Sequence, residues 1–246
     1  HVLDWSRPGL EQTLRTLHDH DVRTAGAGRD ALEAWTPAVV DTSSNMRVAV
    51  LAVGSTSSGI PGSWSAGHEM PGVALLPDLS DDSVDRIATI VGDHTAPNDI
   101  VILSIHWGGN WGYPVPEAHR RFARRVIDGA GIDVVHGHSS HHPLGIEVHR
   151  DRPIIYGCGD LITDYEGIGG HDSFRPHLGG VYEVTVDPSS RSLRRLDVIP
   201  TEVHRFQLRR PSEGDTAWLA SVLDREGSDL GTGATLTDQG RIRVTW

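Results

Sequence analysis

The sequence of 246 residues is 37% hydrophobic, which is enough to bury one large core, so we expect a single α/β domain. A formal net charge of −11 argues against nonspecific nucleic-acid binding, because proteins that bind the phosphate backbone carry a surplus of basic residues. The single cysteine, Cys158, excludes an internal disulfide framework and a thiolate zinc cluster. No run approaches the roughly 20 apolar residues of a membrane-spanning helix, so we expect no membrane segment in this chain.

The first residues, His1-Val2-Leu3-Asp4-Trp5, include neither an initiator methionine nor the charge pattern of a signal peptide. We therefore expect the C-terminal part of a longer chain, with any targeting signal upstream. The sequence leaves the localisation unknown.

Helical and strand patterns alternate through the first half of the chain. Ser6 and Pro8 predict the start of a helix with an apolar face formed by Leu10, Leu14 and Leu17. The further expected elements are strands at 22–25, 47–54, 100–105 and 132–135, helices near 30–35, 81–90 and 117–128, and a Gly/Ser/Pro-rich loop at 55–72. Asp81 and Asp82 are expected to cap the second of these helices. This βαβαβ order predicts a parallel sheet.

After Gly145 the pattern changes to paired strands with tight turns, so the second half is expected to be antiparallel. The expected strands are 146–149, 153–156 and 181–186, followed by a helix near 215–224 and a closing hairpin around 238–240.

His106 directly follows the apolar strand at 100–105, and ligand crevices in open α/β sheets lie at the carboxyl ends of the strands. The position fits a functional histidine and equally a strand-end histidine that a backbone carbonyl satisfies. The aromatic stretch 107–113 has the same two interpretations, as the lining of a substrate pocket or as packing.

Four histidines gather within seven residues, just past the strand at 132–135: His136, His138, His141 and His142. Neutral imidazoles bind borderline divalent metals, and Gly137 lets the backbone turn tightly. We interpret His138 and His141 as metal ligands, against the alternative of a polar loop with incidental histidines. Alternation along an extended segment is expected to turn His136 and His142 away from His138, into supporting or solvated positions.

Two further patterns are interpreted as structural. Residues 26–31 have the G-x-G-x-x-A spacing of a dinucleotide-binding loop, but the strand before them is short and no acidic ribose partner follows in a βαβ pattern. Cys158 follows an apolar strand and no base can be assigned to it, so we expect a buried, inert thiol.

Five short motifs agree in order and spacing with those of one known family. Residues 137–148 resemble G-H-H-P-H-x-x-x-G-I-E-V, residues 106–108 match H-W-G, and residues 156–160 resemble Y-S-L-G-N. Residues 1–5 resemble the tail of N-N-H-x-x-D-x-G, and residues 26–28 fit a G-A-G turn. From residue 1 to about residue 199 the chain resembles CapA, the poly-γ-glutamate capsule biosynthesis branch of the bacterial calcineurin-like metallophosphoesterases.

The resemblance implies a four-layer α/β sandwich of the calcineurin type, with an N-terminal portion outside this sequence. It implies a catalytic role for His1 near the substrate and a site for two divalent ions, Mn, Zn or Fe, on His106, His138 and His141. Supporting or substrate-contacting positions are assigned to Asp4, Asn110, His142, Glu147 and Asp160. Family members occur in the cell envelope or the cytoplasm.

This sequence departs from the family pattern at several positions. The family's upstream G-D and N-x-E motifs are not part of it, so carboxylate ligands are missing from the expected metal site. Ser139-Ser140 replace His-Pro, and Asn110 stands where many relatives have Glu. These departures are compatible with a subgroup that uses another substrate.

Three functions from different classes fit these observations. The first is a metal-dependent hydrolase linked to capsule or poly-γ-glutamate synthesis, acting on a small molecule, a polymer or a peptide. The second is a metal-dependent peptide epimerase of the same fold, in which a histidine removes and returns an α-proton. The third is a non-catalytic polymer-assembly module, which the clustered histidines disfavour because a scaffold does not need convergent imidazoles.

Overall fold

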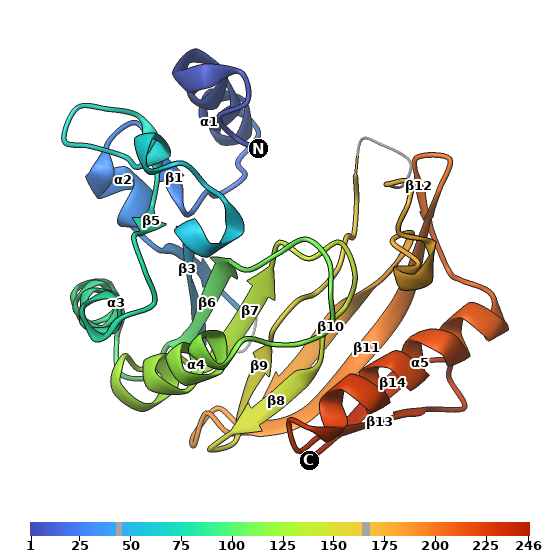
Figure 1. The fold of residues 1–246 in the computed structure, drawn as a ribbon. Coiled ribbons are helices and arrows are strands. Elements are labelled where there is room, and N and C mark those ends of the chain that lie inside the picture. The colour runs from blue at the N-terminus through green and yellow to red at the C-terminus, as the bar shows by residue number, and fades with distance from the viewer. Residues whose placement is uncertain (43–45, 164–167) are drawn as a thin grey trace. The chain divides into compact units, whose positions relative to one another are not determined.

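The structure is a computed structural model that describes residues 1–42, 46–163 and 168–246. Helices and several sheets are mixed along the chain, which confirms the expected α/β class (Figure 1). The chain forms two compact units, an N-terminal unit (His1–Gly108 with Ala118–Val134) and a C-terminal unit (Gly109–Glu117 with Val135–Trp246). Each unit is a set of residues that contact one another more than they contact the rest of the chain. A division of this kind does not test the expected single domain, which stays a prediction.

The main strands of the N-terminal unit are parallel, as expected. β3 (Arg47–Ser55) pairs in parallel with β5 (Leu75–Leu76) and β6 (Ile100–His106), and β2 (Ala38–Asp41) pairs antiparallel with β3. Both β3 and β6 are apolar runs whose side chains enter the core. Gly54 lies opposite His106, so the carboxyl ends of the two strands are neighbours.

In the described part of this unit, the helices beside these strands are α1 (Ser6–Asp19), α2 (Ala31–Trp35), α3 (Asp81–His94) and α4 (Glu117–Gly129). Two short 3-10 turns, Thr56–Ser58 and Gly62–Trp64, lie in the Gly/Ser/Pro-rich loop. The cap of α3 differs from the prediction, because the Ser80 side chain accepts from the backbone N–H of Ser83. Asp81 and Asp82 lie in the first turn, where their charges complement the helix dipole.

The expected strand at 22–25 is wrong, and pairing begins later in the chain. Val22 is exposed, whereas β1 (Ala27–Gly28) pairs antiparallel with β4 (Gly72–Val73). A Cβ on Gly28 would lie 2.4 Å from the backbone nitrogen of Ala34, so a larger residue does not fit between the strand and α2. The G-x-G spacing therefore reflects close backbone packing, in agreement with its structural interpretation.

The histidine-bearing strand of the C-terminal unit is shifted relative to the prediction. β7 spans Val134–His138 instead of 132–135, so His136 and His138 lie within the strand and not in the loop after it. β9 (Arg152–Ile155) pairs in parallel with β7 and antiparallel with β8 (Ile146–His149). The expected tight turn between β8 and β9 is confirmed at Arg150 and Asp151, both with positive φ.

The second sheet of this unit is antiparallel, as predicted. Its order is β10 (Leu178–Val186), β11 (Leu193–His204), β14 (Ile242–Thr245) and β13 (Gly233–Leu236), and β12 (Gln207–Arg209) also pairs with β11. α5 (Glu213–Ser228) covers one face (Figure 1), where Leu219 and Leu223 pack in one core with strand residues such as Leu196 and Ile242. A short 3-10 turn at Asp172–Phe174 precedes β10.

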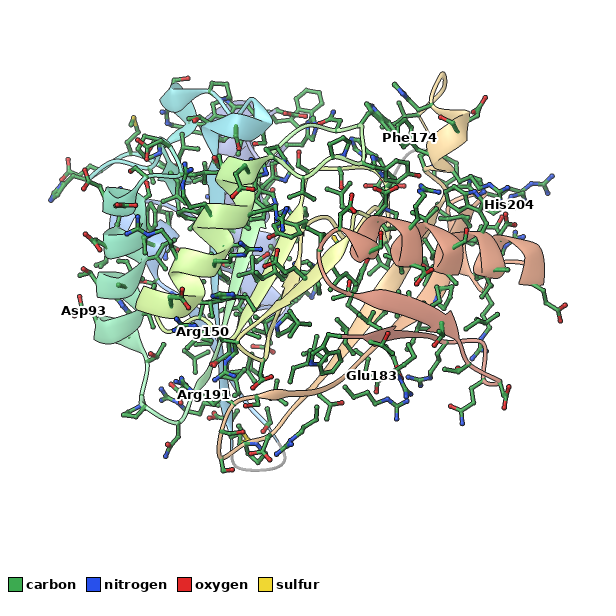
Figure 2. All side chains as sticks on the ribbon, turned by 60° about the horizontal axis from the view of Figure 1, so that its bottom comes forward. Asp93, Arg150, Phe174, Glu183, Arg191 and His204 are labelled. Atoms are coloured by element: carbon green, nitrogen blue, oxygen red, sulfur yellow. The ribbon has the colours of Figure 1, made fainter. Side chains whose placement is uncertain are left out.

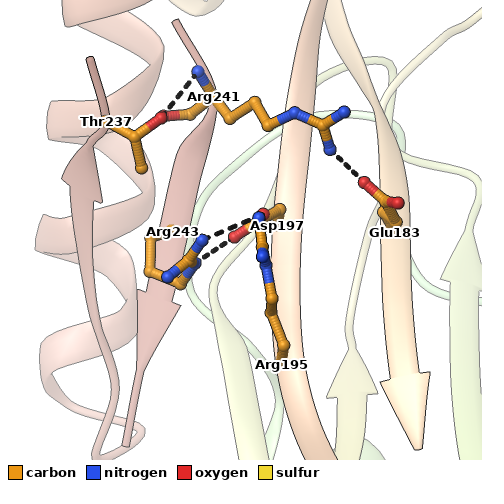
Figure 3. A network of polar contacts seen from close by, with 6 residues as sticks. All are labelled: Glu183, Arg195, Asp197, Thr237, Arg241 and Arg243. Atoms are coloured by element: carbon orange, nitrogen blue, oxygen red, sulfur yellow. Dashed lines mark hydrogen bonds and ion pairs between the residues drawn. The ribbon is translucent and has the colours of Figure 1, made fainter. Parts of the chain in front are cut away.

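A charged network joins β11 to β14 on this sheet (Figure 3). The two strands pair at only two positions, Asp197 with Arg243 and Val198 with Ile242. The carboxylate of Asp197 is fully buried and accepts hydrogen bonds from Arg195 and Arg243. Arg241 forms a separate ion pair with Glu183 on β10. Charged hydrogen bonds thus reinforce a short ladder.

Candidate functional site

The clustered histidines occupy β7 and the loop that follows it. His136 and His138 are both partly buried, and their ring centroids are 5.7 Å apart. The expectation that His136 turns away from His138 is therefore wrong, because side chains two residues apart on a strand share a face. His141 and His142 follow in the loop.

His141 pairs with a carboxylate from a distant part of the chain. Its Nδ1 lies 3.1 Å and 3.0 Å from the two carboxylate oxygens of Asp160, and both side chains are largely buried. The N–H of Cys158 donates to the carbonyl of Gly137 at 3.0 Å, which holds the segment before Asp160 against β7. The carboxylate favours the tautomer with the proton on Nδ1, which leaves the lone pair of the neutral ring on Nε2. In metal sites the second ring N–H of a ligating histidine donates to a carboxylate, a backbone carbonyl or a water, so this pairing agrees with a ligand role for His141.

His142 is a fully buried histidine whose two ring nitrogens both contact the backbone. Nε2 accepts from the N–H of Gly112 at 3.2 Å, and Nδ1 lies 3.2 Å from the carbonyl of Pro143. Burial lowers its pKa to about 4, so the ring is neutral near pH 7. These bonds fasten the 109–117 segment to the histidine loop, which agrees with a supporting position for His142.

Trp111 is the centre of an aromatic wall beside His141 and His142. Its ring stacks on His171 with centroids 3.9 Å apart and an interplanar angle of 9°, and it lies 5.4 Å from His141. Tyr113 and Phe174 contact His142 and each other, and the guanidinium of Arg225 lies over Tyr113. Figure 2 labels Phe174 within this part of the C-terminal unit. The wall packs aromatic rings against His141 and His142.

Sequence reasoning missed His171 and Phe174. They follow Gly169 and Gly170 in a segment without helical or strand periodicity, so only proximity to Trp111 identifies them. The structure shows a packing role for the aromatic stretch 107–113, and the lining of a substrate pocket stays a prediction. Trp107 packs in the N-terminal unit against His119 and Phe122, whereas Trp111 and Tyr113 belong to the wall.

Two other predicted residues of the C-terminal unit have clear partners. The backbone carbonyl of Asn110 accepts from the N–H of His141 at 3.1 Å, so this residue positions the histidine loop through its backbone. Glu147 is buried on β8 and accepts a hydrogen bond from the hydroxyl of Tyr156 at 2.9 Å.

His106, His1 and Asp4 lie in the N-terminal unit. His106 is the last residue of β6. In the loop that follows it, the N–H of Gly108 donates a hydrogen bond to Ser57 Oγ at 3.2 Å. Nδ1 of His1 lies 2.7 Å from the carboxylate of Asp4, which orients this exposed ring.

The predicted ligand set is distributed over both units. His106 belongs to the N-terminal unit, and His138 and His141 belong to the C-terminal unit. Within residues 1–42, 46–163 and 168–246, no group of three or more His, Cys, Asp or Glu residues is arranged to hold a metal ion. The set of three histidines stays a prediction.

The family follows from comparison with known proteins. The family model described as "Bacterial capsule synthesis protein PGA_cap" matches residues 1–165. The chain belongs to this family. The resemblance to CapA, drawn from the motifs around the histidines, is thereby confirmed.

Two relatives illustrate the similarity. The chain is 46% identical over 226 residues to a "probable polyglutamine synthesis accessory protein" found in two strains of Mycobacterium tuberculosis, which covers 92% of this chain and 59% of the relative. It is 24% identical over 206 residues to the "PGA biosynthesis protein CapA" of Bacillus subtilis, with 83% and 49% covered. The chain thus spans about half to three-fifths of the length of these relatives.

The PGA_cap match covers the histidine cluster but not the whole aromatic wall. It includes the histidines and Asp160, but it ends at residue 165, before His171, Phe174 and the antiparallel sheet with α5. The family match thus covers the predicted metal ligands but only part of the aromatic wall.

Three other features of this PGA_cap chain bear on its chemistry. Burial raises the pKa of the Cys158 thiol to about 11, in agreement with an inert cysteine. A hollow of about 570 Å³ in the C-terminal unit is lined in part by Pro200, Arg210 and Leu236, and none of the predicted site residues lines it. None of the helices in the described part of the chain has the length and apolar character that a bilayer crossing requires.

Proposed function

We propose that this chain forms part of a metal-dependent hydrolase of the CapA type that serves synthesis of a capsule or polyglutamate polymer. The pairing of His141 with Asp160 is the observation that carries the proposal, because it prepares one imidazole nitrogen to donate a lone pair. Membership of the PGA_cap family and the names of the relatives support the link to polymer synthesis. The four-layer calcineurin-like sandwich is part of this proposal.

Neutral imidazoles are suitable ligands for borderline divalent ions such as Mn, Zn or Fe. His106, His138 and His141 would hold them, with Asp160 orienting His141. Such ions, when bound, polarise a scissile group and lower the pKa of bound water.

The remaining roles belong to side chains of this chain. His1, oriented by Asp4, would donate a proton to the leaving group. The aromatic residues around Trp111 would line one side of the substrate pocket and exclude water from it. His142 keeps the 109–117 segment in place and stays neutral, so it adds no charge to the site.

Metal content and turnover of the full-length protein test this proposal. His141→Ala should remove bound metal and activity on an aryl phosphate ester, and Asp160→Asn should weaken metal binding about 10-fold to 100-fold. His68→Ala, at an exposed histidine of the N-terminal unit, is the matched control and should change neither quantity. Unchanged metal content in the first two variants would remove His141 and Asp160 from the site.

The same protein distinguishes the alternative functions. A hydrolase should lose turnover on His1→Ala while it keeps its metal. An epimerase should show negligible hydrolysis and should place one deuterium at an α-carbon of a peptide incubated in deuterium oxide. Metal binding without either reaction would favour the polymer-assembly module and contradict the hydrolase.

A further inference from the structure

The hairpin of β11 and β12 ends in a short arm, residues 202–210, that is exposed from residue 204 onward. Three residue pairs form it, Glu202 with Arg209, Val203 with Leu208 and His204 with Gln207. Every residue from 204 to 210 is exposed. Figure 2 shows His204 at the opposite end of the β10–β11 hairpin from Arg191, and Figure 1 shows β12 at that same end.

The turn at the tip of the arm uses residues that its backbone disfavours. Arg205 and Phe206 have φ values of 50° and 58°, the pattern of a two-residue turn that normally contains Asn-Gly. A bulky aromatic residue at positive φ is a genuine outlier, and such strain gathers at binding sites. The turn between β8 and β9 has the same pattern, but its residues, Arg150 and Asp151, are polar. The backbone of the arm is therefore strained at the position where the apolar ring of Phe206 is exposed.

The arm combines apolar and cationic side chains, and its one carboxylate is Glu202 at the root, opposite Arg209. Phe206 is 65% exposed and Leu208 is 42% exposed. Arg205, Arg209 and Arg210 lie around them. This local positive charge contrasts with the net charge of −11 of the whole chain.

Further apolar surface lies near the root of the arm. A Cβ on Gly179 would overlap the carbonyl oxygen of Asp160, so these two residues touch. Gly179 pairs with Thr201, the residue before the arm begins. Leu161 and Ile162, which follow Asp160, are both exposed. The apolar surface at this end of the C-terminal unit is therefore wider than the tip alone.

We propose that the arm docks the protein on an anionic lipid surface. Phe206 and Leu208 enter the boundary between headgroups and acyl chains, and Arg205, Arg209 and Arg210 bind lipid phosphates. A soluble polyanion would use the arginines but leave the Phe206 ring in water. An apolar protein partner would use the ring but would not need a cluster of cations. The combination fits a lipid surface best, and it does not depend on metal chemistry.

Vesicle flotation of the full-length protein tests this proposal. The protein should bind phosphatidylcholine vesicles that contain phosphatidylglycerol, bind pure phosphatidylcholine poorly, and lose binding as salt rises. Arg209→Gln should lower partitioning about five-fold. Phe206→Ser should lower partitioning, whereas Trp5→Ser, at an even more exposed aromatic residue outside the arm, should not.

A pair of turn variants separates binding from folding. Arg205→Asn with Phe206→Gly gives the arm the residues that its turn favours, so thermal stability should stay equal or rise while partitioning falls about ten-fold or more. Arg150→Asn with Asp151→Gly makes the same change in the other turn and should leave partitioning unchanged. The proposal would be overturned if the arm variant bound vesicles as well as the native protein does. Equal binding to neutral vesicles, or displacement from vesicles by soluble polyglutamate at low concentration, would overturn it as well.

Discussion

Replacing Asp197 by Asn tests whether buried charge holds β11 to β14. The substitution keeps the shape of the side chain but removes the negative charge that Arg195 and Arg243 share. Glu183→Gln is the matched control, because Glu183 also pairs with an arginine on this sheet but is 53% exposed, whereas Asp197 is 0% exposed.

The expected loss of stability follows from the burial of the Asp197 carboxylate and the partial exposure of its two arginine partners. Breaking a buried ion pair costs roughly 3–5 kcal/mol when the remaining charge has no access to water. Here the side chains of Arg195 and Arg243 are 47% and 35% exposed, so water partly replaces the lost bonds. We expect Asp197→Asn to lower the free energy of unfolding by about 2 kcal/mol. Glu183→Gln should lower it by no more than about 0.5 kcal/mol.

Urea denaturation across pH is the assay. The hydrogen bond from Arg243 lowers the pKa of Asp197 in the folded protein. The stabilisation is therefore fully present above the unfolded carboxyl pKa of about 4 and is lost as pH falls through the lower folded pKa. The difference between the native chain and Asp197→Asn should shrink below about pH 4. Equal urea midpoints at pH 7, or a difference that persists in acid, would refute the reasoning.

Two further predictions concern packing. Gly28→Ala should destabilise the protein by about 2 kcal/mol in urea denaturation, because the new methyl group overlaps α2. The control, Gly92→Ala in the exposed part of α3, should be neutral or stabilising. Equal urea midpoints for the two variants would contradict the close-packing argument. Burial raises the pKa of the Cys158 thiol to about 11, so it should react with iodoacetamide on the order of 100-fold more slowly in the folded protein than in urea. Rapid labelling of the folded protein would show instead that the thiol is accessible and ionised.

Long apolar runs made the parallel strands predictable. β3 and β6 are continuous apolar segments, and the structure places both within a residue of the expected bounds. The short elements were harder to predict. The strand expected at 22–25 has no partner there, because the complementary strand β4 meets the chain at Ala27 and Gly28. A two-residue strand is defined by its partner and leaves no periodicity in the sequence.

The same distinction applies to the candidate site. The histidine cluster is visible in the sequence because its members are neighbours, and the motifs around it led to the family. The later start and end of β7, by two and three residues, were not visible in the sequence, and they place His136 and His138 on one face of the strand. A strand boundary depends on which residues the neighbouring strand pairs with, so local hydrophobicity cannot fix it.

The sequence by itself determined the α/β class, the order of the elements, the family and the clustering of histidines at a strand end. Tertiary structure alone decided that Asp160 meets His141, that His171 and Phe174 join Trp111, and that Asp197 lies buried between two arginines. The physical reason is that hydrophobic periodicity records which face of each local segment is buried. Contacts between residues many positions apart depend on strand register and on the path of the intervening loops, which no local pattern encodes.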